Sequence, residues 1–201
     1  MALKVSALLL AAGESTRMGV LKQLLRIRER PAILMCLESI LEAGIEDVFV
    51  VVRSREKGVL EFLQGQPVIL VANDLPGSDM AASVRFGLSS IGPDATGILV
   101  SLCDYPLVSP ATLGALRQEH QLRPEAIVIP RHHGKNGHPT LFPRTVLEEI
   151  RTLPTLRDII SRHHAEVTYR NVDDEGILLD MDTPEDYQRI LEVSERRKIR
   201  S

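Results

Sequence analysis

The sequence has few aromatic residues and few cysteines. Phenylalanine, tyrosine and tryptophan make up 3% of its 201 residues, and tryptophan is absent. Aromatic platforms that stack nucleic-acid bases therefore have few side chains to draw on. The two cysteines, Cys36 and Cys103, lie far apart and form no Cys-x-x-Cys pair, which argues against a zinc knuckle or a disulfide framework. We expect a protein of the reducing cytoplasm.

A large excess of charge of either sign is also missing. The 24 lysines and arginines against 27 acidic residues give a net charge of -3, so we expect no nucleic-acid partner. Long apolar runs are absent too, because the apolar segment 5–12 is far shorter than the roughly 20 residues of a membrane span. It runs directly into a polar, glycine-containing segment, and we interpret it as a buried strand and expect no membrane partner.

Short apolar runs alternate with helical patterns along the first two thirds of the chain. The runs are nearly continuous, as in strands buried on both faces, and they cover residues 5–10, 47–52, 68–71, 97–101 and 126–129. Between them, apolar residues recur at helical spacing in residues 33–41, 59–63 and 80–88. This alternation predicts an α/β, three-layer fold with a mostly parallel central sheet.

Residues that typically start or end helices fit this pattern, and we expect a single domain over residues 1–195. Gly44 has the position of a helix C-cap, and Pro110 after Ser109 that of a first helical residue. The sequence Thr183-Pro-Glu-Asp186 predicts the start of a helix that continues through Glu192. Residues 165–172 form a further strand candidate, and we expect the basic segment 196–201 to be a frayed tail.

Small residues and two cations follow the first predicted strand. In the segment Leu10-Ala-Ala-Gly-Glu-Ser-Thr-Arg-Met-Gly19, backbone N–H groups can approach an anion closely. Arg17 offers a fork for phosphate oxygens, and Lys22 offers a mobile positive charge. The segment fits neither a Walker loop nor a dinucleotide fingerprint, and the alternative is an ordinary turn.

Asp104 follows the apolar run 98–102 and is therefore expected at the C-terminal edge of the sheet, where open α/β folds bind ligands. Mg²⁺ prefers oxygen ligands and usually takes one or two carboxylates, so Asp104 is a candidate ligand. The alternative is an aspartate that caps the turn at Tyr105-Pro106. Further along the chain, Asp180 and Asp182 precede the predicted helix start at Thr183, and Asp182 can belong to the helix cap.

Two other segments can contribute to a site. Residues 77–85 place small residues at the start of a helix, where Ser83 and Arg85 are candidates for binding a nucleotide; the alternative is a tight helix start packed on the sheet. Asn136, Gly137 and His138 form a glycine-rich loop that can approach a substrate. The other histidines, His132, His133, His163 and His164, have no carboxylate at a recognised zinc spacing, so we expect them to be solvated.

Five segments, in order along the chain, resemble the signature of nucleotidyltransferases related to MobA. They are Leu10-Ala-Ala-Gly-x-Ser-x-Arg-Met-Gly-x-x-Lys22, Gly77-x-x-Met-Ala-x-Ser-Val-Arg-x-Gly-Leu88, Cys103-Asp-x-Pro106, Gly137-His-Pro-x-Leu-Phe142 and Asp180-x-Asp-Thr-Pro-Glu-Asp186. The Ala-Ala-Gly form, with Ala12 in its centre, resembles the cytidylyltransferase branch, MocA, whereas the guanylyltransferases typically carry Ala-Gly-Gly. The resemblance implies a Rossmann-like nucleotidyltransferase fold.

The resemblance also implies a reaction, in which CMP passes from CTP to the phosphate of a molybdopterin cofactor and pyrophosphate is released. Asp104 and a second carboxylate near the end of the domain would hold Mg²⁺; Asp182 is the first choice for this second ligand and Asp180 is the alternative. Arg17, Lys22 and Asp104 would be catalytic. The nucleotide would be bound by these cations and by Leu10, Ala11, Ala12, Gly13, Glu14, Ser15, Met18, Gly19, Ser83 and Arg85. Asn136, Gly137 and His138 would contact the acceptor, a phosphorylated pterin, and a molybdoenzyme apoprotein or its chaperone would be a further partner.

Two departures from the family pattern keep other functions open. The segment Thr152-Leu-Pro-Thr-Leu-Arg157 replaces a Gly-Asp-containing version on the acceptor side, and Arg28-Glu-Arg-Pro31 replaces Gly-x-Pro. The alternatives are a transferase of the same fold that uses GTP or acts on a sugar or alcohol phosphate, and a nucleotide-binding regulator or delivery partner of a molybdoenzyme.

Overall fold

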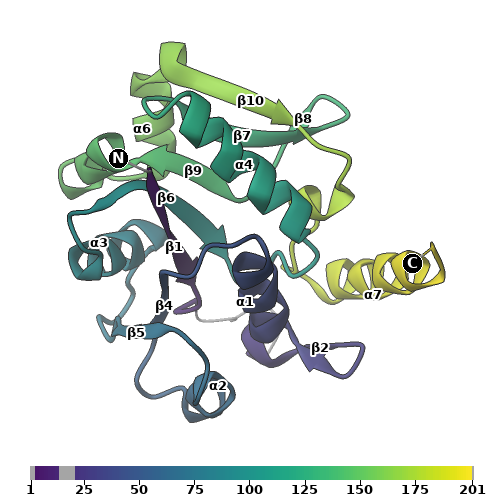
Figure 1. The fold of residues 1–201 in the computed structure, drawn as a ribbon. Helices are drawn as coiled ribbons and strands as arrows, with labels where there is room; N and C mark the ends of the chain where they lie inside the picture. Colours follow the sequence, from purple (N-terminus) through teal and green to yellow (C-terminus); the bar gives the residue numbers. More distant parts are fainter. Residues whose placement is uncertain (1–2, 14–20, 201) are drawn as a thin grey trace.

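One eight-stranded sheet forms the centre of the protein in the computed structural model, which describes residues 3–13 and 21–200 (Figure 1). The neighbouring strands follow the order β10-β7-β9-β6-β1-β4-β5, and β8 pairs with β7 at one end. The strands are β1 (Lys4–Leu10), β4 (Val48–Val52), β5 (Ile69–Ala72), β6 (Ala95–Leu102), β7 (Ile127–His132), β8 (Lys135–Asn136), β9 (Thr140–Pro143) and β10 (Val167–Asn171). A separate hairpin joins β2 (Arg26–Ile27) to β3 (Arg30–Pro31).

Most of the sheet is parallel, as the sequence predicts. Strands β5, β4, β1 and β6 pair in parallel, and so do β7 and β10. Strand β9 lies antiparallel between β6 and β7 and joins these two groups. The C-terminal ends of β1, β4, β5, β6, β7 and β10 therefore meet at one edge of the sheet.

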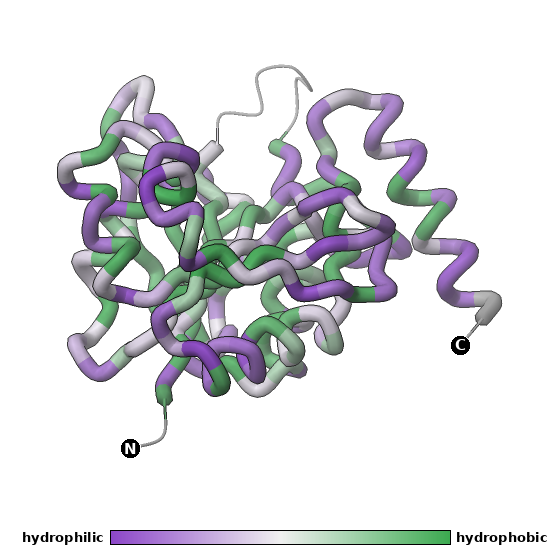
Figure 2. Tube along the Cα trace, turned by 90° about the horizontal axis from the view of Figure 1, so that it is seen from above, coloured by the Kyte–Doolittle hydropathy of each residue, from purple (hydrophilic) through white to green (hydrophobic). Residues whose placement is uncertain are grey.

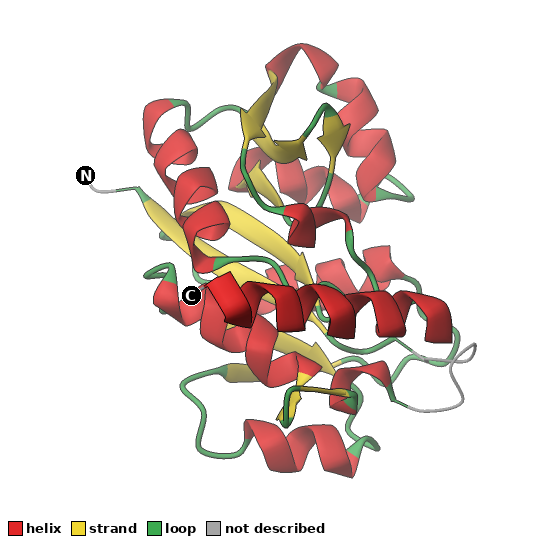
Figure 3. Ribbon diagram, turned by 90° about the vertical axis from the view of Figure 1, so that its right-hand side faces the viewer, coloured by secondary structure: helices red, strands yellow, loops and turns green. Residues whose placement is uncertain are grey.

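Helices cover both faces of the sheet and give the three layers (Figure 3). The α-helices are α1 (Ala32–Glu42), α2 (Lys57–Leu63), α3 (Met80–Ser90), α4 (Pro110–Leu122), α5 (Arg144–Leu147), α6 (Leu156–Arg162) and α7 (Pro184–Arg200). Short 3₁₀ turns are η1 (Lys22–Leu24), η2 (Glu148–Arg151), η3 (His164–Glu166) and η4 (Glu175–Leu178). Helices α1, α2 and α4 pack on one face, whereas α3, α5 and α6 pack on the other.

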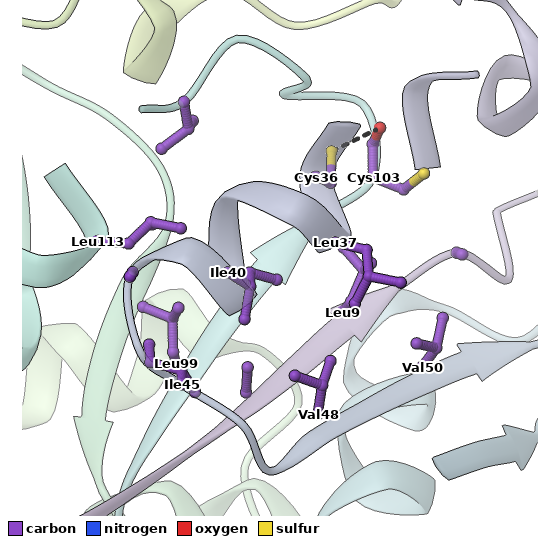
Figure 4. Packing of buried hydrophobic residues seen from close by; sticks show 14 of the residues in the cluster. Leu9, Cys36, Leu37, Ile40, Ile45, Val48, Val50, Leu99, Cys103 and Leu113 are labelled. Atoms are coloured by element: carbon purple, nitrogen blue, oxygen red, sulfur yellow. Dashed lines mark hydrogen bonds between the residues drawn. The ribbon is translucent and has the colours of Figure 1, made fainter. Parts of the chain in front are cut away.

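The alternation of side chains along each strand divides the core into two layers. In β1, Ala7 and Leu9 point toward α1, whereas Leu8 packs against α3 on the other face. Figure 4 shows the first layer, where Leu37 and Ile40 of α1 lie above the strands. Hydrophobic residues concentrate in the middle of the molecule, and hydrophilic residues lie mainly toward its periphery (Figure 2). Among the residues that the structure describes, no helix has the length and apolar character needed to span a membrane.

The predicted elements agree with the observed ones to within a few residues, but three details differ. The sequence analysis assigned no strand to residues 140–143, which form β9. Met80 begins the segment 80–88, in which apolar residues recur at helical spacing, but its side chain is exposed and lines a cavity instead of packing in the core. Finally, helix α7 continues to Arg200, so most of the segment predicted to be a frayed tail is helical.

Asp174 explains why the last helix continues so far. One of its carboxylate oxygens accepts hydrogen bonds from the N–H of Ser109 and the hydroxyl of Thr112, each at 2.8 Å. The other lies 2.7 Å from a guanidinium nitrogen of Arg197, in the segment predicted to fray. A buried carboxylate thus ties the start of α4 to α7. Burial by itself would raise the pKa of Asp174, but these donors outweigh it and lower the pKa below its usual value.

Asp174→Asn should destabilise the protein at neutral pH by about 1–3 kcal/mol, because it weakens hydrogen bonds to a charged acceptor. Since the folded-state pKa is lowered, the stabilisation is present above the unfolded-state pKa and is lost as the pH falls through the folded-state value. Urea unfolding at a series of pH values should show the difference between the two proteins shrinking below about pH 4. A difference that stays constant down to pH 2 would contradict this role.

Candidate active site

A cavity of about 440 Å³ opens at the C-terminal edge of the parallel strands, between β1, β6 and the start of α3. Its walls include the segment after β1, the residues that follow β6 and Asp182, which lies two residues before α7. Its lining residues are Leu10, Ala12, Gly13, Lys22, Gln23, Gly77, Ser78, Asp79, Met80, Ser83, Leu102, Cys103, Asp104 and Asp182. This is the edge where open α/β sheets bind their ligands.

Two side chains hold the carbonyl groups of the segment after β1. The amide nitrogen of Gln23 donates to the carbonyl oxygens of Ala11 at 2.8 Å and Gly13 at 3.2 Å. The Nε of Arg53, at the end of β4, donates to the carbonyl of Ala12 at 2.8 Å. Gln23 and Arg53 are both almost fully buried, so they hold the backbone of this segment against the interior of the protein. These hydrogen bonds satisfy the carbonyl groups of Ala11, Ala12 and Gly13.

Three carboxylates gather opposite that segment. The N–H of Met181 donates to the carbonyl of Asp104 at 3.1 Å, and this bond brings Asp180 and Asp182 beside Asp104. Burial is the main cause that raises the pKa of Asp104 to about 6; the negative charges of Asp180 and Asp182 add to it, and Lys22 opposes it. Burial also raises the pKa of Asp180. The cluster therefore carries a negative charge that a cation would stabilise.

Lys22 already supplies part of this compensation. Its ammonium nitrogen lies 2.6 Å from a carboxylate oxygen of Asp182, although the two residues are 160 positions apart in the sequence. The contact joins the side of the cavity that contains the segment after β1 to the side that contains the carboxylates. Lys22 therefore lies where it can contact both an anionic ligand in the cavity and the carboxylate of Asp182.

The carboxylates fit a divalent cation such as Mg²⁺. The Oδ1 atom of Asp104 is buried and has no hydrogen-bond partner among the described residues. A buried carboxylate oxygen without a partner is costly unless a ligand satisfies it. Oxygen donors from one or two carboxylates are the ligands that Mg²⁺ takes when substrate phosphates complete its coordination. Asp104 and Asp182, which both line the cavity, would hold the ion.

The opposite wall begins at helix α3. Asp79 caps this helix by accepting a hydrogen bond from the N–H of Ala82 at 2.7 Å. The buried side chain of Asn73, which follows β5, donates to the hydroxyl groups of Ser78 at 3.1 Å and Ser83 at 2.8 Å. Asn73 therefore orders the loop between β5 and α3, which forms this side of the cavity.

A second cavity of about 510 Å³ adjoins the first and shares Asp79, Met80 and Leu102 with it. Most of its lining residues are apolar. Besides the three shared residues, the lining consists of Ala81, Val100, His138, Thr140, Phe142, Pro154, Thr155, Leu156, Arg157 and Ile160. The imidazole of His138 lies 4.9 Å from the ring of Tyr105, and burial lowers its pKa, so the ring is neutral at neutral pH. Two adjoining cavities can hold two substrates side by side.

The structure brings together many of the residues proposed from the sequence. Leu10, Ala12, Gly13, Lys22, Ser83, Asp104 and Asp182 line the first cavity, and His138 lines the second. The backbone of Ala11 lies next to the first cavity, where its carbonyl binds Gln23. Glu14, Ser15, Arg17, Met18 and Gly19 lie outside the described residues.

Three other proposed residues do not line either cavity. Asn136 is exposed and accepts a hydrogen bond from Arg131, and Gly137 packs against the carbonyl of Ile177. Arg85 points away from the first cavity and donates to the carbonyl of Ile150 at 2.8 Å. Residues two positions apart on a helix lie on nearly opposite sides, so Ser83 and Arg85 cannot both face one ligand.

Arg85→Ala should leave nucleotide affinity within about twofold of the wild type and lower the thermal stability, because it removes a hydrogen bond from a charged donor worth roughly 1.5–3 kcal/mol. Calorimetric titration with CTP and a melting curve measure the two effects. A tenfold loss of affinity with an unchanged melting temperature would instead place Arg85 on the nucleotide.

Residues 7–167 match the model of the MobA-like NTP transferase domain. The chain belongs to this family. It is therefore a nucleotidyltransferase, as the five sequence segments indicated, and its α/β fold with a mostly parallel sheet is the fold of its structural neighbours. Rv0371c of Mycobacterium tuberculosis H37Rv has 30% identity and a TM-score of 0.82, and the alignment covers 96% of this chain and 100% of that one.

Two curated relatives of this MobA-like domain have names that describe function. The bifunctional protein GlmU of Carboxydothermus hydrogenoformans is 31% identical over 58% of this chain and 26% of its own length. A probable molybdenum cofactor guanylyltransferase of Synechococcus elongatus is 33% identical over 60% of each chain. The chain thus spans about a quarter of GlmU and less than two thirds of the guanylyltransferase. A second structure of Rv0371c, with 30% identity, TM-score 0.77 and coverage of 94% of this chain and 98% of that one, is a complex with manganese.

Several residues of the MobA-like site were not found by sequence reasoning. Arg53 and Asn73 each follow the last residue of a parallel strand, and this position relative to the sheet edge is a signal that could have identified them. Gln23 had no such signal apart from its place beside Lys22. The apolar wall formed by Phe142, Leu156 and Ile160 comes from elements that only the fold brings together.

Proposed function

We propose that this MobA-like domain transfers CMP from CTP to the terminal phosphate of a molybdopterin cofactor and releases pyrophosphate. The observation that carries the proposal is the pair of adjoining cavities, one with Lys22 and three acidic side chains and the other largely apolar. The triphosphate fits the charged cavity, and a flat pterin ring fits the apolar one. The shared wall at Met80 and Leu102 would then lie where the two substrates meet.

In the proposed reaction, an oxygen of the acceptor phosphate attacks the α-phosphorus of CTP. The bond from this phosphorus to the bridging oxygen breaks, and that oxygen keeps the electron pair as pyrophosphate leaves. Lys22, and Arg17 by its resemblance to the family motif, would stabilise the negative charge on the leaving group. The segment Leu10 to Gly13, held by Gln23 and Arg53, would bind the nucleotide through its backbone. Such a transfer depends mainly on positioning and requires no covalent intermediate with the protein.

Mg²⁺ is the cofactor that we propose, with Asp104 and Asp182 as its protein ligands. The ion would neutralise phosphate charge and align the reacting groups. Support comes from the unsatisfied buried oxygen of Asp104 and from the manganese complex of the related Rv0371c. Asp180, which lines neither cavity, would contribute through its charge.

The choice of CTP over GTP rests on Ala12. This residue lines the first cavity and carries a methyl group that the Ala-Gly-Gly pattern lacks at this position. Ala12→Gly should therefore increase the kcat/KM for GTP relative to CTP about tenfold or more, the range expected for one methyl group in a pocket. Pyrophosphate release with a panel of nucleotides and a molybdopterin acceptor measures the ratio. A wild-type preference for GTP would overturn the cytidylyl assignment and favour the activity named for the guanylyltransferase relative.

The same assay separates the two alternative functions. Turnover with a sugar or alcohol phosphate but not with a pterin would indicate another acceptor, for which the unusual segment 152–157 beside the second cavity gives a structural reason. Tight nucleotide binding without turnover on any acceptor would indicate a regulator, or a delivery partner that acts on a molybdoenzyme apoprotein or its chaperone.

A further inference from the structure

Two histidines and an aspartate meet beyond the ends of β7 and β10, outside both cavities. His132 is the last residue of β7, His133 begins the turn to β8, and Asp173 lies two residues after β10. The parallel pairing of β7 and β10 aligns Arg131 with Asn171, and the N–H of Val172 donates to the carbonyl of Arg131 at 2.9 Å. These backbone contacts hold the histidines beside a carboxylate that is 40 positions away in the sequence. The sequence had shown no such carboxylate near these histidines.

We propose that His132, His133 and Asp173 form a binding site for a divalent transition-metal ion of the Zn²⁺ type. One ligand atom from each residue can be chosen so that all three lie within 4.8 Å of one another. Bonds of about 2.0–2.2 Å to nitrogen and oxygen would hold such ligands roughly 3–4 Å apart. His133 and Asp173 are exposed at the surface, so small rotations of their side chains can bring the ligand atoms to this shorter spacing without any change of the backbone.

The orientation of His132 is already that of a metal ligand. Its Nδ1 atom lies 3.0 Å from the carbonyl oxygen of Val172. Because a carbonyl only accepts hydrogen bonds, Nδ1 carries the proton, and Nε2 is left with a free electron pair. Metal-bound histidines typically donate their second ring nitrogen to a carbonyl in this way, which fixes both the tautomer and the ring direction. His132 is therefore prepared to bind a metal through Nε2.

The turn places His133 beside His132 by an uncommon backbone conformation. His133 has φ 45°, in the left-handed region, and Gly134 follows with φ 80°. The imidazoles of His132 and His133 lie with their centroids 4.2 Å apart. The nearest arginine of β7, Arg131, is engaged elsewhere, since its guanidinium lies 3.7 Å from the ring centroid of Tyr169 and donates to Asn136. These contacts of the Arg131 side chain are thus with Tyr169 and Asn136 and not with His132, His133 or Asp173.

The ligand set also decides which ions the site prefers. Two imidazoles and one carboxylate suit borderline ions such as Zn²⁺, Ni²⁺ and Co²⁺, whereas Mg²⁺ prefers oxygen ligands alone. Three protein ligands leave at least one position for water. The site is thus chemically distinct from the carboxylates at Asp104 and Asp182.

A metal here would connect two segments that support the predicted acceptor loop. The hairpin β7–β8 holds Gly137, whose N–H donates to the carbonyl of Pro130 at 3.0 Å. The chain after Asp173 holds His138, whose N–H donates to the carbonyl of Ile177 at 2.9 Å. The ion would tie these segments together and restrict the movement of the loop between them.

Calorimetric titration of the full chain with ZnCl₂, in excess MgCl₂, tests the site. The variants are His133→Asn, which retains a residue tolerant of positive φ, and Asp173→Asn, which retains the shape of the side chain. His164→Asn removes an exposed histidine outside the cluster and serves as the matched control. The wild type and the control should bind one Zn²⁺ with equal affinity, and each cluster variant should bind it at least about tenfold more weakly.

Amide hydrogen exchange gives a second readout that needs no activity. Zn²⁺ should slow exchange in residues 133–137 and 172–177 of the wild type and the control, but not in Asp173→Asn. Equal Zn²⁺ affinity in all four proteins, or no stoichiometric binding to the wild type, would overturn the proposal. Circular dichroism of each variant verifies that it is folded.

Discussion

Asp104→Asn should lower kcat for Mg²⁺-dependent pyrophosphate release by about a thousandfold. A metal ion supplies several kcal/mol of transition-state stabilisation, and each 1.36 kcal/mol corresponds to a factor of ten in rate. Asparagine keeps the shape of the side chain but removes the charge that would hold the ion. Steady-state kinetics over a range of Mg²⁺ concentrations measures the effect, and retained turnover would refute the role of Asp104.

The same substitution should not unfold the protein, and this separates lost catalysis from lost structure. Burial raises the pKa of Asp104 to about 6, so its ionised form opposes folding. A raised folded-state pKa gives stability that is present below the unfolded-state value and is lost as the pH rises through about 6. Without metal at pH 8, Asp104→Asn should therefore be more stable than the wild type, by at most about 3 kcal/mol for a shift of about two pKa units.

Two further variants show which carboxylate acts with Asp104. Asp182→Asn should also cause a large loss of activity and an increase in the Mg²⁺ concentration needed for half-maximal rate. Asp180→Asn should have a much smaller effect, because Asp180 does not line the cavity. The reverse order would assign the second metal contact to Asp180.

Gly137→Ala should produce the largest loss of stability among single methyl additions at the acceptor side. A Cβ atom at this position would lie 2.2 Å from the carbonyl oxygen of Ile177 and 2.7 Å from its Cγ1 atom. The oxygen belongs to the backbone and also accepts the hydrogen bond from His138, so the contact cannot be relieved without moving the loop. Overpacking of this kind costs typically about 1–3 kcal/mol.

Gly114→Ala is the matched control, because a Cβ atom there meets no other atom within 4 Å and the residue lies inside helix α4. It should stabilise the protein by about 0.5–1 kcal/mol. Chemical denaturation of both variants measures the contrast. The KM for the acceptor should rise in Gly137→Ala while nucleotide affinity stays the same, and equal stability of the two variants would contradict the close packing at Gly137.

The layers of the fold could be predicted from the sequence because buried parallel strands carry a strong local pattern. The runs in β1, β4 and β6 are nearly continuously apolar because helices cover both faces of the sheet. Strand β9 has no such signal, because only Leu141 and Phe142 form its apolar run between Thr140 and Pro143, and β6, with which it pairs over its whole length, is distant in the sequence. The tail prediction had a similar limit, since Arg197 is held by Asp174, whose position depends on the complete fold.

The residues of the candidate site also fall into those that local sequence patterns indicate and those that only the complete fold brings into place. Lys22, Ala12 and Asp104 follow strands or belong to a local motif, so the sequence placed them at the correct sheet edge. Arg85 was proposed from the same motif as Ser83, but helical geometry turns it to the opposite side. The residues that support the site from below, such as Gln23 and Arg53, make their contacts through tertiary packing that local patterns do not encode.

The reversed direction of β9 has a consequence for how such a domain can diversify. Because β9 runs antiparallel to β6, its first residue, Thr140, pairs with Val100 close to the edge where the nucleotide cavity lies. The hairpin of β7 and β8 therefore delivers residues 136–139 to that edge without a crossover helix. If the proposed function is right, exchange of this hairpin, or of the segment 152–157 beside the second cavity, would alter the acceptor while the strands that precede Ala12 and Asp104 keep their register. Chimeras made at these boundaries should inherit the acceptor of the donor protein and the nucleotide of the recipient.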